Sequence, residues 1–351
     1  MNLSQDFISN VKNILVVGKN NQVGDMICSL PLYFALKKKF TEAQITLVAA
    51  KTNYPIPLKD INPQLDNILV YDKSSLKTVF KFYKELRKVK YQIGIVTSTF
   101  AFSTTSHIIN FLSGAKVRVG VKSIDGKINK AARYLNIKKD FFWDKEKKHQ
   151  SERNLDVVRQ IGCNLTRKEI KNIRLKIDDT DDIFAESFLT KSFPDNSKMI
   201  FGFHPGAGKK ENIWPPEKFV EVITQLYKSY NNYILITAGM TDAEIINSLG
   251  IRLKELKIPF EIAENFEIKK LAAVLSRINL YITNDTGPMH IAGAVGAKLI
   301  SLFGPTKAYE WSPYMENQFY IQSKANNISD INTEEVLGLC NKILTDPHLS
   351  D

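Results

Sequence analysis

The chain has 351 residues, which is long for a single hydrophobic core and favours two domains. Hydrophobic residues make up 44% of it and charged residues 24%, as in ordinary soluble globular proteins, so a predominantly disordered chain is excluded. The formal net charge of +11 favours an anionic partner, which could be a nucleic acid, an anionic membrane surface or an acidic glycolipid. Individual charge runs are by default solvated helix faces.

Three features bear on the cellular compartment. The cysteines, Cys28, Cys163 and Cys340, are odd in number and far apart, so we expect neither a disulfide framework nor a metal site built on them. Residues 1–18 lack the charged start, apolar core and cleavage site of a secretory signal. Residues 91–115 carry no Lys, Arg, Asp or Glu, but their polar side chains argue against a membrane span. We therefore expect a cytoplasmic protein.

Apolar runs and helical periodicities alternate along the first half of the chain. Residues 13–18 form a continuous apolar run of the kind found in buried parallel strands. A helix that ends in a lysine cluster is expected over 25–40. Further strands are predicted at 45–50, 92–97 and 117–120, and further helices at 76–89, 106–113 and 149–161. This alternation indicates a parallel sheet with helices on both faces.

The second half follows the same pattern, and we place the boundary so that the domains are 1–178 and 179–351. The segment DDTDD (178–182) contains a D-x-D pattern that could hold a metal ion, but a solvated helix start is favoured. Strands are predicted at 199–204, 233–238, 260–263, 280–283 and 298–303, and helices at 216–230, 243–256, 268–276, 289–295 and 333–344.

The segment NDTGP (284–288) is the clearest candidate ligand site. It follows an apolar strand and leads into residues with helical spacing. Pro288 fits the first turn of a helix, and Gly287 lets the backbone approach a ligand closely. The unpaired N–H groups of the helix start, the Thr286 hydroxyl and the positive end of the helix dipole together favour a phosphate or diphosphate. The alternative is that Asp285 and Thr286 only cap the helix.

A glycine-rich loop, GAGKK (206–210), is the second candidate. It is not a P-loop, because Gly202 to Gly208 is one residue too long and Lys209 is followed by Lys rather than Ser or Thr. An ATPase is therefore disfavoured. The loop still suits close backbone approach to a phosphate, with Lys209 and Lys210 to neutralise the charge.

Three segments together resemble glycosyltransferase family 9, the lipopolysaccharide heptosyltransferases. They are DTGPMHIAGAVGAKLISLFGPT (285–306), HPGAGKKENIWPPEKF (204–219) and GDMICSLPLYFAL (24–36). A fourth segment, HQSERNL (149–155), also resembles the family and could serve interdomain packing or acceptor contact. The resemblance covers most of the chain. It implies an α/β fold of the GT-B type, with two doubly wound Rossmann-like domains facing a central cleft, the first for the acceptor and the second for a nucleotide-sugar.

The resemblance also implies roles for individual residues. Asp25 matches the general base, which takes the proton of the acceptor hydroxyl as that hydroxyl attacks the anomeric carbon. Taken alone, Asp25 would be interpreted as a helix cap. The residues matched to donor binding are Gly206, Lys209, Lys210, Glu244, Asp285, Thr286, Gly287 and His290.

Two donor contacts stay open at this point. The acid that binds the ribose could be Asp242 or Glu244, and we favour Glu244. The family's phosphate-binding lysine lies two residues before the Trp-Pro pair, where this chain has Asn212. Lys209 or Lys210 could reach the same phosphate from the loop.

The implied activity is that of an inverting glycosyltransferase that needs neither a metal nor a cofactor. It would move a heptose or related sugar from ADP-heptose to an acidic acceptor of the lipopolysaccharide core or lipid A type, on the inner face of the inner membrane, where the protein would bind peripherally. One alternative is a sugar-nucleotide epimerase of GT-B architecture. Another is a catalytically inactive nucleotide-sugar-binding protein, which the residue Asn212 makes plausible. Nucleic-acid binding is disfavoured because no recognisable motif is present.

Overall fold

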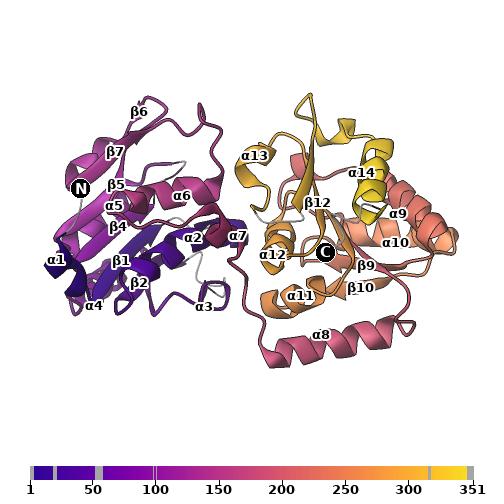
Figure 1. Cartoon of the computed structure of the whole chain (residues 1–351), viewed down its shortest axis with the longest axis horizontal. Coiled ribbons are helices and arrows are strands. Elements are labelled where there is room, and N and C mark those ends of the chain that lie inside the picture. The colour runs from indigo at the N-terminus through magenta and orange to yellow at the C-terminus, as the bar shows by residue number, and fades with distance from the viewer. Residues whose placement is uncertain are drawn as a thin grey trace. The chain divides into compact units, whose positions relative to one another are not determined.

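The computed structural model describes residues 4–18, 22–51, 58–97, 99, 101–314 and 318–345. The chain forms two compact units, which divide between Ile173 and Arg174. The sequence-based boundary at 178/179 lies shortly after this point. Figure 1 shows the two units as separate α/β assemblies, each with its own sheet.

The first unit contains a parallel sheet in the order β3-β2-β1-β4-β5, with β7 added in parallel beside β5 and β6 paired with β5 in an antiparallel hairpin. Its strands are β1 Asn13–Gly18, β2 Gln44–Ala50, β3 Asn67–Tyr71, β4 Ile93–Thr97, β5 Val117–Ile124, β6 Lys127–Ile128 and β7 Ile137–Phe141. Its helices are α1 Gln5–Ser9, α2 Val23–Lys39, α3 Leu58–Ile61, α4 Leu76–Leu86, α5 Thr104–Leu112, α6 Gln150–Arg159 and α7 Arg167–Lys171, with a 3-10 turn at Lys130–Tyr134.

The central strand β1 is buried on both faces, which explains its uninterrupted apolar sequence. Leu15 and Val17 pack with Phe82 and Leu86 of α4 and with Ile109 of α5. Alternate residues of a strand point to opposite faces, so the other β1 side chains serve the opposite face of the sheet. On that face α2 and α6 lie side by side (Figure 1).

The second unit is a six-stranded parallel sheet in the order β10-β9-β8-β11-β12-β13. Its strands are β8 Ile200–His204, β9 Tyr233–Ala238, β10 Glu261–Glu264, β11 Leu280–Asn284, β12 Leu299–Phe303 and β13 Gln318–Gln322. Its helices are α8 Asp179–Ser192, α9 Pro216–Tyr230, α10 Ala243–Glu255, α11 Ile268–Leu275, α12 Gly287–Val295, α13 Ala308–Trp311 and α14 Thr333–Thr345, with 3-10 turns at Lys210–Asn212 and Ile328–Asp330.

Helices cover both faces of this second sheet. α9, α10 and α14 lie on one side of it, and α11 and α12 lie on the other, with α8 packed against α11 (Figure 1). Phe219, Val222, Leu249 and Val336 bring the first three helices into one buried apolar cluster with the strands. The predicted pair of parallel α/β units is confirmed.

Besides the two-residue hairpin strand β6, the structure adds three strands that the sequence did not predict, namely β3, β7 and β13. Each is short, lies at an edge of its sheet and is only partly buried, so none shows the continuous apolar run of a central parallel strand. The DDTDD segment is a helix start, as favoured, because Asp178 is the N-cap residue of α8 and forms an ion pair with Lys269 at 2.7 Å.

Within the uncharged stretch 91–115, the structure describes the buried strand β4 and the helix α5, as expected, while residues 98 and 100 between them lie outside the described residues. In the described part of the chain, no helix combines the length and the apolarity that a membrane crossing requires.

Candidate functional site

The strand order of the second unit reverses between β8 and β11, its two central strands. In sheets of this kind ligands bind beyond the carboxyl ends of the strands at the point of reversal. The loop after β8 contains Gly206 and Lys209, and the loop after β11 contains Asp285 and Thr286. The fold therefore brings together the two segments that the sequence singled out.

The start of α12 is open to a ligand. Thr286 is the N-cap residue, but its hydroxyl makes no capping bond to the described helix and lies 3.3 Å from Thr283 Oγ1 instead. Pro288 occupies the first turn, as predicted. Because the cap does not satisfy the N–H groups of the first turn, these groups and the helix dipole can act on an anion.

Asp285 does not cap α12 either. Its Oδ2 accepts a hydrogen bond from Asn212 Nδ2 at 3.1 Å, and Asn212 Nδ2 also lies 3.4 Å from Thr306 Oγ1. Burial raises the pKa of the Asp285 carboxyl, and hydrogen bonds from Thr306 and Asn212 and the positive charge of Lys209 oppose this rise. Asn212 is only 5% exposed, and among the described residues its Oδ1 has no hydrogen-bond partner. The site therefore contains a buried acceptor that nothing in the described chain satisfies.

Asn284, the last residue of β11, holds the two loops together. Its side-chain Nδ2 donates to Pro205 O at 2.8 Å and to Gly206 O at 3.2 Å. Its Oδ1 accepts from Trp214 N at 3.2 Å. Because Asn284 is fully buried, these bonds fix the glycine-rich loop relative to the start of α12.

Asp242 lies directly beneath the glycine-rich loop. A Cβ on Gly206 would come within 2.3 Å of the Asp242 carboxylate, so only glycine fits there. Asp242 Oδ2 accepts from Gly239 N at 2.7 Å and lies 3.8 Å from His204 Nε2. Burial lowers the pKa of His204, and the negative charge of Asp242 opposes this decrease. With 4% exposure Asp242 supports the loop from below, whereas Glu244 is exposed in the first turn of α10.

The remaining predicted donor contacts differ in exposure. Lys209 and Lys210 are exposed on the loop, and Lys209 is near enough to affect the pKa of Asp285. His290 is 5% exposed in the first turn of α12, with its ring 6.4 Å from that of Trp311. Burial lowers the pKa of His290 to about 4, so the ring is neutral at pH 7. It can contribute shape and a hydrogen bond there, but not a positive charge.

Asp25 lies in the first unit, in the first turn of α2. Its Oδ2 accepts a hydrogen bond from Gln22 N at 3.2 Å, so the carboxylate does serve as a cap. It is half-buried, and the strand order of this unit reverses between β1 and β4, so α2 begins at the equivalent point of the first sheet. Residues 19–21 of the preceding loop lie outside the described residues.

A hollow of about 740 Å³ lies at the carboxyl ends of β1, β2 and β3. Val17, Val48 and Ile109 contribute apolar walls, and Lys51 and Lys73 contribute positive charge. Lys51 forms an ion pair with Asp72 at 2.8 Å. A partly apolar hollow with a few polar groups is the usual form of a small-molecule site.

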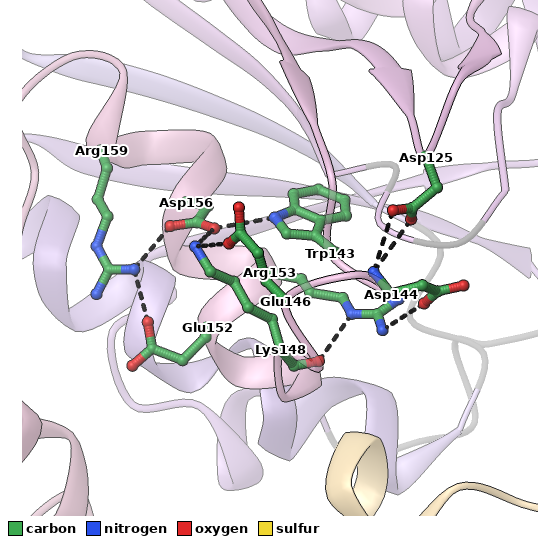
Figure 2. A network of polar contacts seen from close by, with 9 residues as sticks. All are labelled: Asp125, Trp143, Asp144, Glu146, Lys148, Glu152, Arg153, Asp156 and Arg159. Carbon is green, nitrogen blue, oxygen red and sulfur yellow. Dashed lines mark hydrogen bonds and ion pairs between the residues drawn. The ribbon is translucent and has the colours of Figure 1, made fainter.

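The HQSERNL segment begins α6, and its neighbourhood is drawn in Figure 2. Asp156 accepts hydrogen bonds from Trp143 Nε1 at 2.9 Å, Lys148 Nζ at 2.7 Å and Arg159 at 2.7 Å. Arg153 forms an ion pair with Asp144 at 2.8 Å. All these partners belong to the first unit, so this network stabilises that unit from within.

Another contact of the same segment reaches α2. Asn154 Nδ2 donates to Cys28 O at 3.2 Å and so ties α6 to the helix that carries Asp25. No group of three or more His, Cys, Asp or Glu side chains that could hold a metal ion occurs among the residues that the structure describes.

Two doubly wound parallel units in one chain define the GT-B class of glycosyltransferase folds. Residues 79–340 match the sequence model of glycosyltransferase family 9 (heptosyltransferase). The protein belongs to this family and is a glycosyltransferase.

Similar proteins agree with this assignment. Lipooligosaccharide heptosyltransferase 2 of Campylobacter jejuni is 25% identical over 295 residues, which are 83% of this chain and 81% of that protein. A glycosyltransferase family 9 structure from Veillonella parvula superposes with a TM-score of 0.77 at 20% identity, covering 98% of this chain and 99% of that one. The structure of the E. coli ADP-heptose lps heptosyltransferase II superposes with a TM-score of 0.72 at 21% identity, covering 95% of this chain and 98% of that one.

Two residues of this site are not evident from the sequence. Asn284 begins the NDTGP segment without a predicted role of its own, although a buried amide at the end of a central strand needs hydrogen-bond partners. Thr306 closes the FGPT segment and lies beside Asn212. No local pattern pairs either residue with its partners, which lie 70 or more positions away in the sequence.

Proposed function

We propose that the protein transfers a heptose or a closely related sugar from ADP-heptose to an acceptor of the lipopolysaccharide core. The observation that carries the proposal is the open start of α12 beside the half-buried Asp285, in a chain of the heptosyltransferase family. The similar E. coli protein is an ADP-heptose lps heptosyltransferase, which supports this donor.

The diphosphate of the donor would lie at the start of α12. The N–H groups of the first turn and the Thr286 hydroxyl would donate to it, while Lys209 and Lys210 neutralise its charge. Gly206 would allow the loop backbone to approach. Such preorganised donors stabilise the negative charge that develops on a leaving phosphate without a metal ion.

The rest of the donor would extend to the neighbouring loops. Glu244 is the better candidate for the ribose hydroxyls, since Asp242 is buried under the loop. Asp285 and the neutral His290 would face the sugar. The unsatisfied Asn212 Oδ1 would accept a hydrogen bond from a donor hydroxyl, a role that a lysine at this position could not fill.

Asp25 would act as the general base. Its carboxylate would take the proton of the acceptor hydroxyl while the acceptor oxygen bonds to the anomeric carbon and the bond from that carbon to the phosphate oxygen breaks. ADP leaves, and a single displacement of this kind inverts the anomeric configuration. The hydrogen bond from Gln22 N would orient the carboxylate for this role.

The acceptor would bind to the first unit as an acidic glycolipid. The hollow at the ends of β1, β2 and β3, with Lys51 and Lys73 in its lining, supports this part of the proposal. The net charge of +11 would favour a peripheral position on the cytoplasmic face of an anionic membrane.

Calorimetric titration tests the donor site. We expect metal-free protein to bind ADP in preference to UDP and GDP, and Thr286→Ala to weaken ADP binding by about tenfold, the effect of one hydrogen bond to a charged group. Absence of diphosphate binding would refute the transferase proposal. Conversion of the nucleotide-sugar alone, without an acceptor, would favour the epimerase instead.

A second experiment tests the general base and separates a transferase from an inactive binding protein. Asp25→Asn should lower kcat by about 10²- to 10⁴-fold with ADP affinity unchanged. The matched control is Glu169→Gln, which alters the same kind of cap, since Glu169 accepts from Thr166 N at the start of α7. Equal activity of the parent and Asp25→Asn would rule out Asp25 as the base.

A further inference from the structure

Two large apolar side chains stand out on the surface of the first unit. Leu76 is 90% exposed and Phe80 is 74% exposed, both on α4. Residues four apart are neighbours on a helix, so the two form one protruding apolar site. Scattered exposed apolar residues are ordinary, but an adjacent Leu and Phe at nearly full exposure require a reason.

The folding of α4 does not require these two side chains. The opposite side of the helix carries Phe82 and Leu86, which are buried against β1 and α5. Ser75 caps the start of the helix by accepting from Thr78 N at 3.1 Å. Leu76 and Phe80 are therefore free to meet something outside the fold.

The side chains around the apolar pair are basic. Lys77, Lys81 and Lys84 are exposed and lie on the same side of α4 at helical spacing, and Lys73 precedes the helix. The nearby acids are already paired, since Asp72 binds Lys51 at 2.8 Å and Glu85 binds Lys88 at 2.7 Å. The outer face of α4, defined here as Leu76, Lys77, Phe80, Lys81 and Lys84, is thus positively charged with an apolar tip.

This outer face is continuous with the hollow of the first unit. Tyr71, Asp72, Lys73 and Ser74 line the hollow and lead directly into the cap of α4. Leu76 is therefore only a few residues along the chain from the lining of the hollow, so a surface that contacts Leu76 would also lie close to the hollow.

We propose that the outer face of α4 is the surface by which the protein docks on an anionic lipid bilayer. Leu76 and Phe80 would enter the boundary between headgroups and acyl chains, and the lysines would lie against anionic headgroups, as in interfacial helices of this composition. The inference rests on the proposed transfer to a membrane-held acceptor. It adds that docking presents the hollow to that acceptor's headgroup.

Vesicle flotation tests the docking surface without donor or acceptor. The full-length protein should float with phosphatidylcholine vesicles that contain phosphatidylglycerol, and far less with phosphatidylcholine alone. Leu76→Ser/Phe80→Ser and Lys77→Gln/Lys81→Gln/Lys84→Gln should each reduce binding to the anionic vesicles by about tenfold or more. Two controls in the same unit should bind as the parent does: Ile128→Ser, at a 74% exposed residue, and Lys127→Gln/Lys130→Gln/Lys139→Gln, at exposed lysines.

The outcomes separate this inference from the proposed function. ADP binding and transfer to a delipidated, water-soluble acceptor fragment should be the same in the α4 variants and the parent. A parent that does not bind anionic vesicles, or α4 variants that bind them as well as the controls do, would overturn the docking surface while leaving transfer intact. A dimer in sedimentation that Leu76→Ser/Phe80→Ser dissociates would overturn it too, in favour of a second copy of the chain.

Discussion

Asn212 and Asp285 are 73 positions apart in the sequence, yet Asn212 Nδ2 donates to Asp285 Oδ2 at 3.1 Å. The amide holds a partly desolvated carboxylate at the start of α12 while its own Oδ1 stays buried without a partner among the described residues. An asparagine here can both donate and accept, whereas a lysine can only donate. The pair therefore offers the most direct tests of the donor site.

Asn212→Asp keeps the shape of the side chain but places a second carboxylate beside Asp285. Two like charges at this distance repel each other and also repel a diphosphate, so ADP affinity should fall by at least about tenfold at pH 7.5, as calorimetry can measure. Asn231→Asp is the control, since it adds the same charge before β9 at the opposite end of the sheet. Unchanged ADP affinity in Asn212→Asp would show that this pair lies outside the donor site.

Gly206→Ala should disturb the loop above Asp242. The new Cβ would lie 2.3 Å from a carboxylate that is fixed by Gly239 N, so the loop must shift. We expect a loss of about 2 kcal/mol in the free energy of unfolding and weaker ADP binding. Gly208→Ala, in the same loop, meets no atom within 4 Å and should match the parent in both measurements. Similar losses in both variants would mean that general loop flexibility, rather than the contact with Asp242, is responsible.

The buried His290 should make stability depend on pH. Its pKa is about 4 in the folded chain and 6.5 ordinarily, so only the unfolded chain takes up a proton between these values. The contribution of His290 to the free energy of unfolding is therefore fully present above pH 6.5 and is lost as the pH falls toward 4. The loss from this group alone is about 3 kcal/mol. In His290→Gln, the free energy of unfolding measured with urea should depend less on pH over that range than it does in the parent. Parallel curves for the two proteins would contradict the burial of a neutral ring.

Asp156→Ala should destabilise the first unit. The substitution removes the hydrogen-bond acceptor of Nε1 in the fully buried Trp143, and it removes the carboxylate that Lys148 and Arg159 share. The free energy of unfolding, measured with urea, should fall by about 3 kcal/mol. ADP binding in the second unit should not change. Glu146→Ala removes a half-exposed partner of Lys148 and should cost less than about 1 kcal/mol. Equal costs in the two variants would argue against a central role for Asp156 in the network.

Several features of the protein followed from local sequence alone. The continuous apolar runs of β1, β8 and β11 and the periodicity of the intervening helices predicted two parallel α/β units, because burial on both faces leaves a direct mark on composition. The Gly-Pro pair at 287–288 marked the start of α12, and the glycine-rich loop marked a close backbone approach. Edge strands such as β3 and β13 do not show this continuous apolar composition because their side chains are only partly buried.

Tertiary structure decided the rest, since the relevant contacts join residues that are distant in the chain. The sequence left both Asp242 and Glu244 open as the ribose-binding acid, with Glu244 favoured, and the packing of Gly206 on Asp242 gives a physical reason to separate them. The bond from Asn212 to Asp285 arises because β8 and β11 are neighbours in the sheet, so the loops after them meet. Local composition fixes what a segment can form, while the order of the strands fixes which loops share a site and which helix faces, such as that of Leu76 and Phe80, stay uncovered.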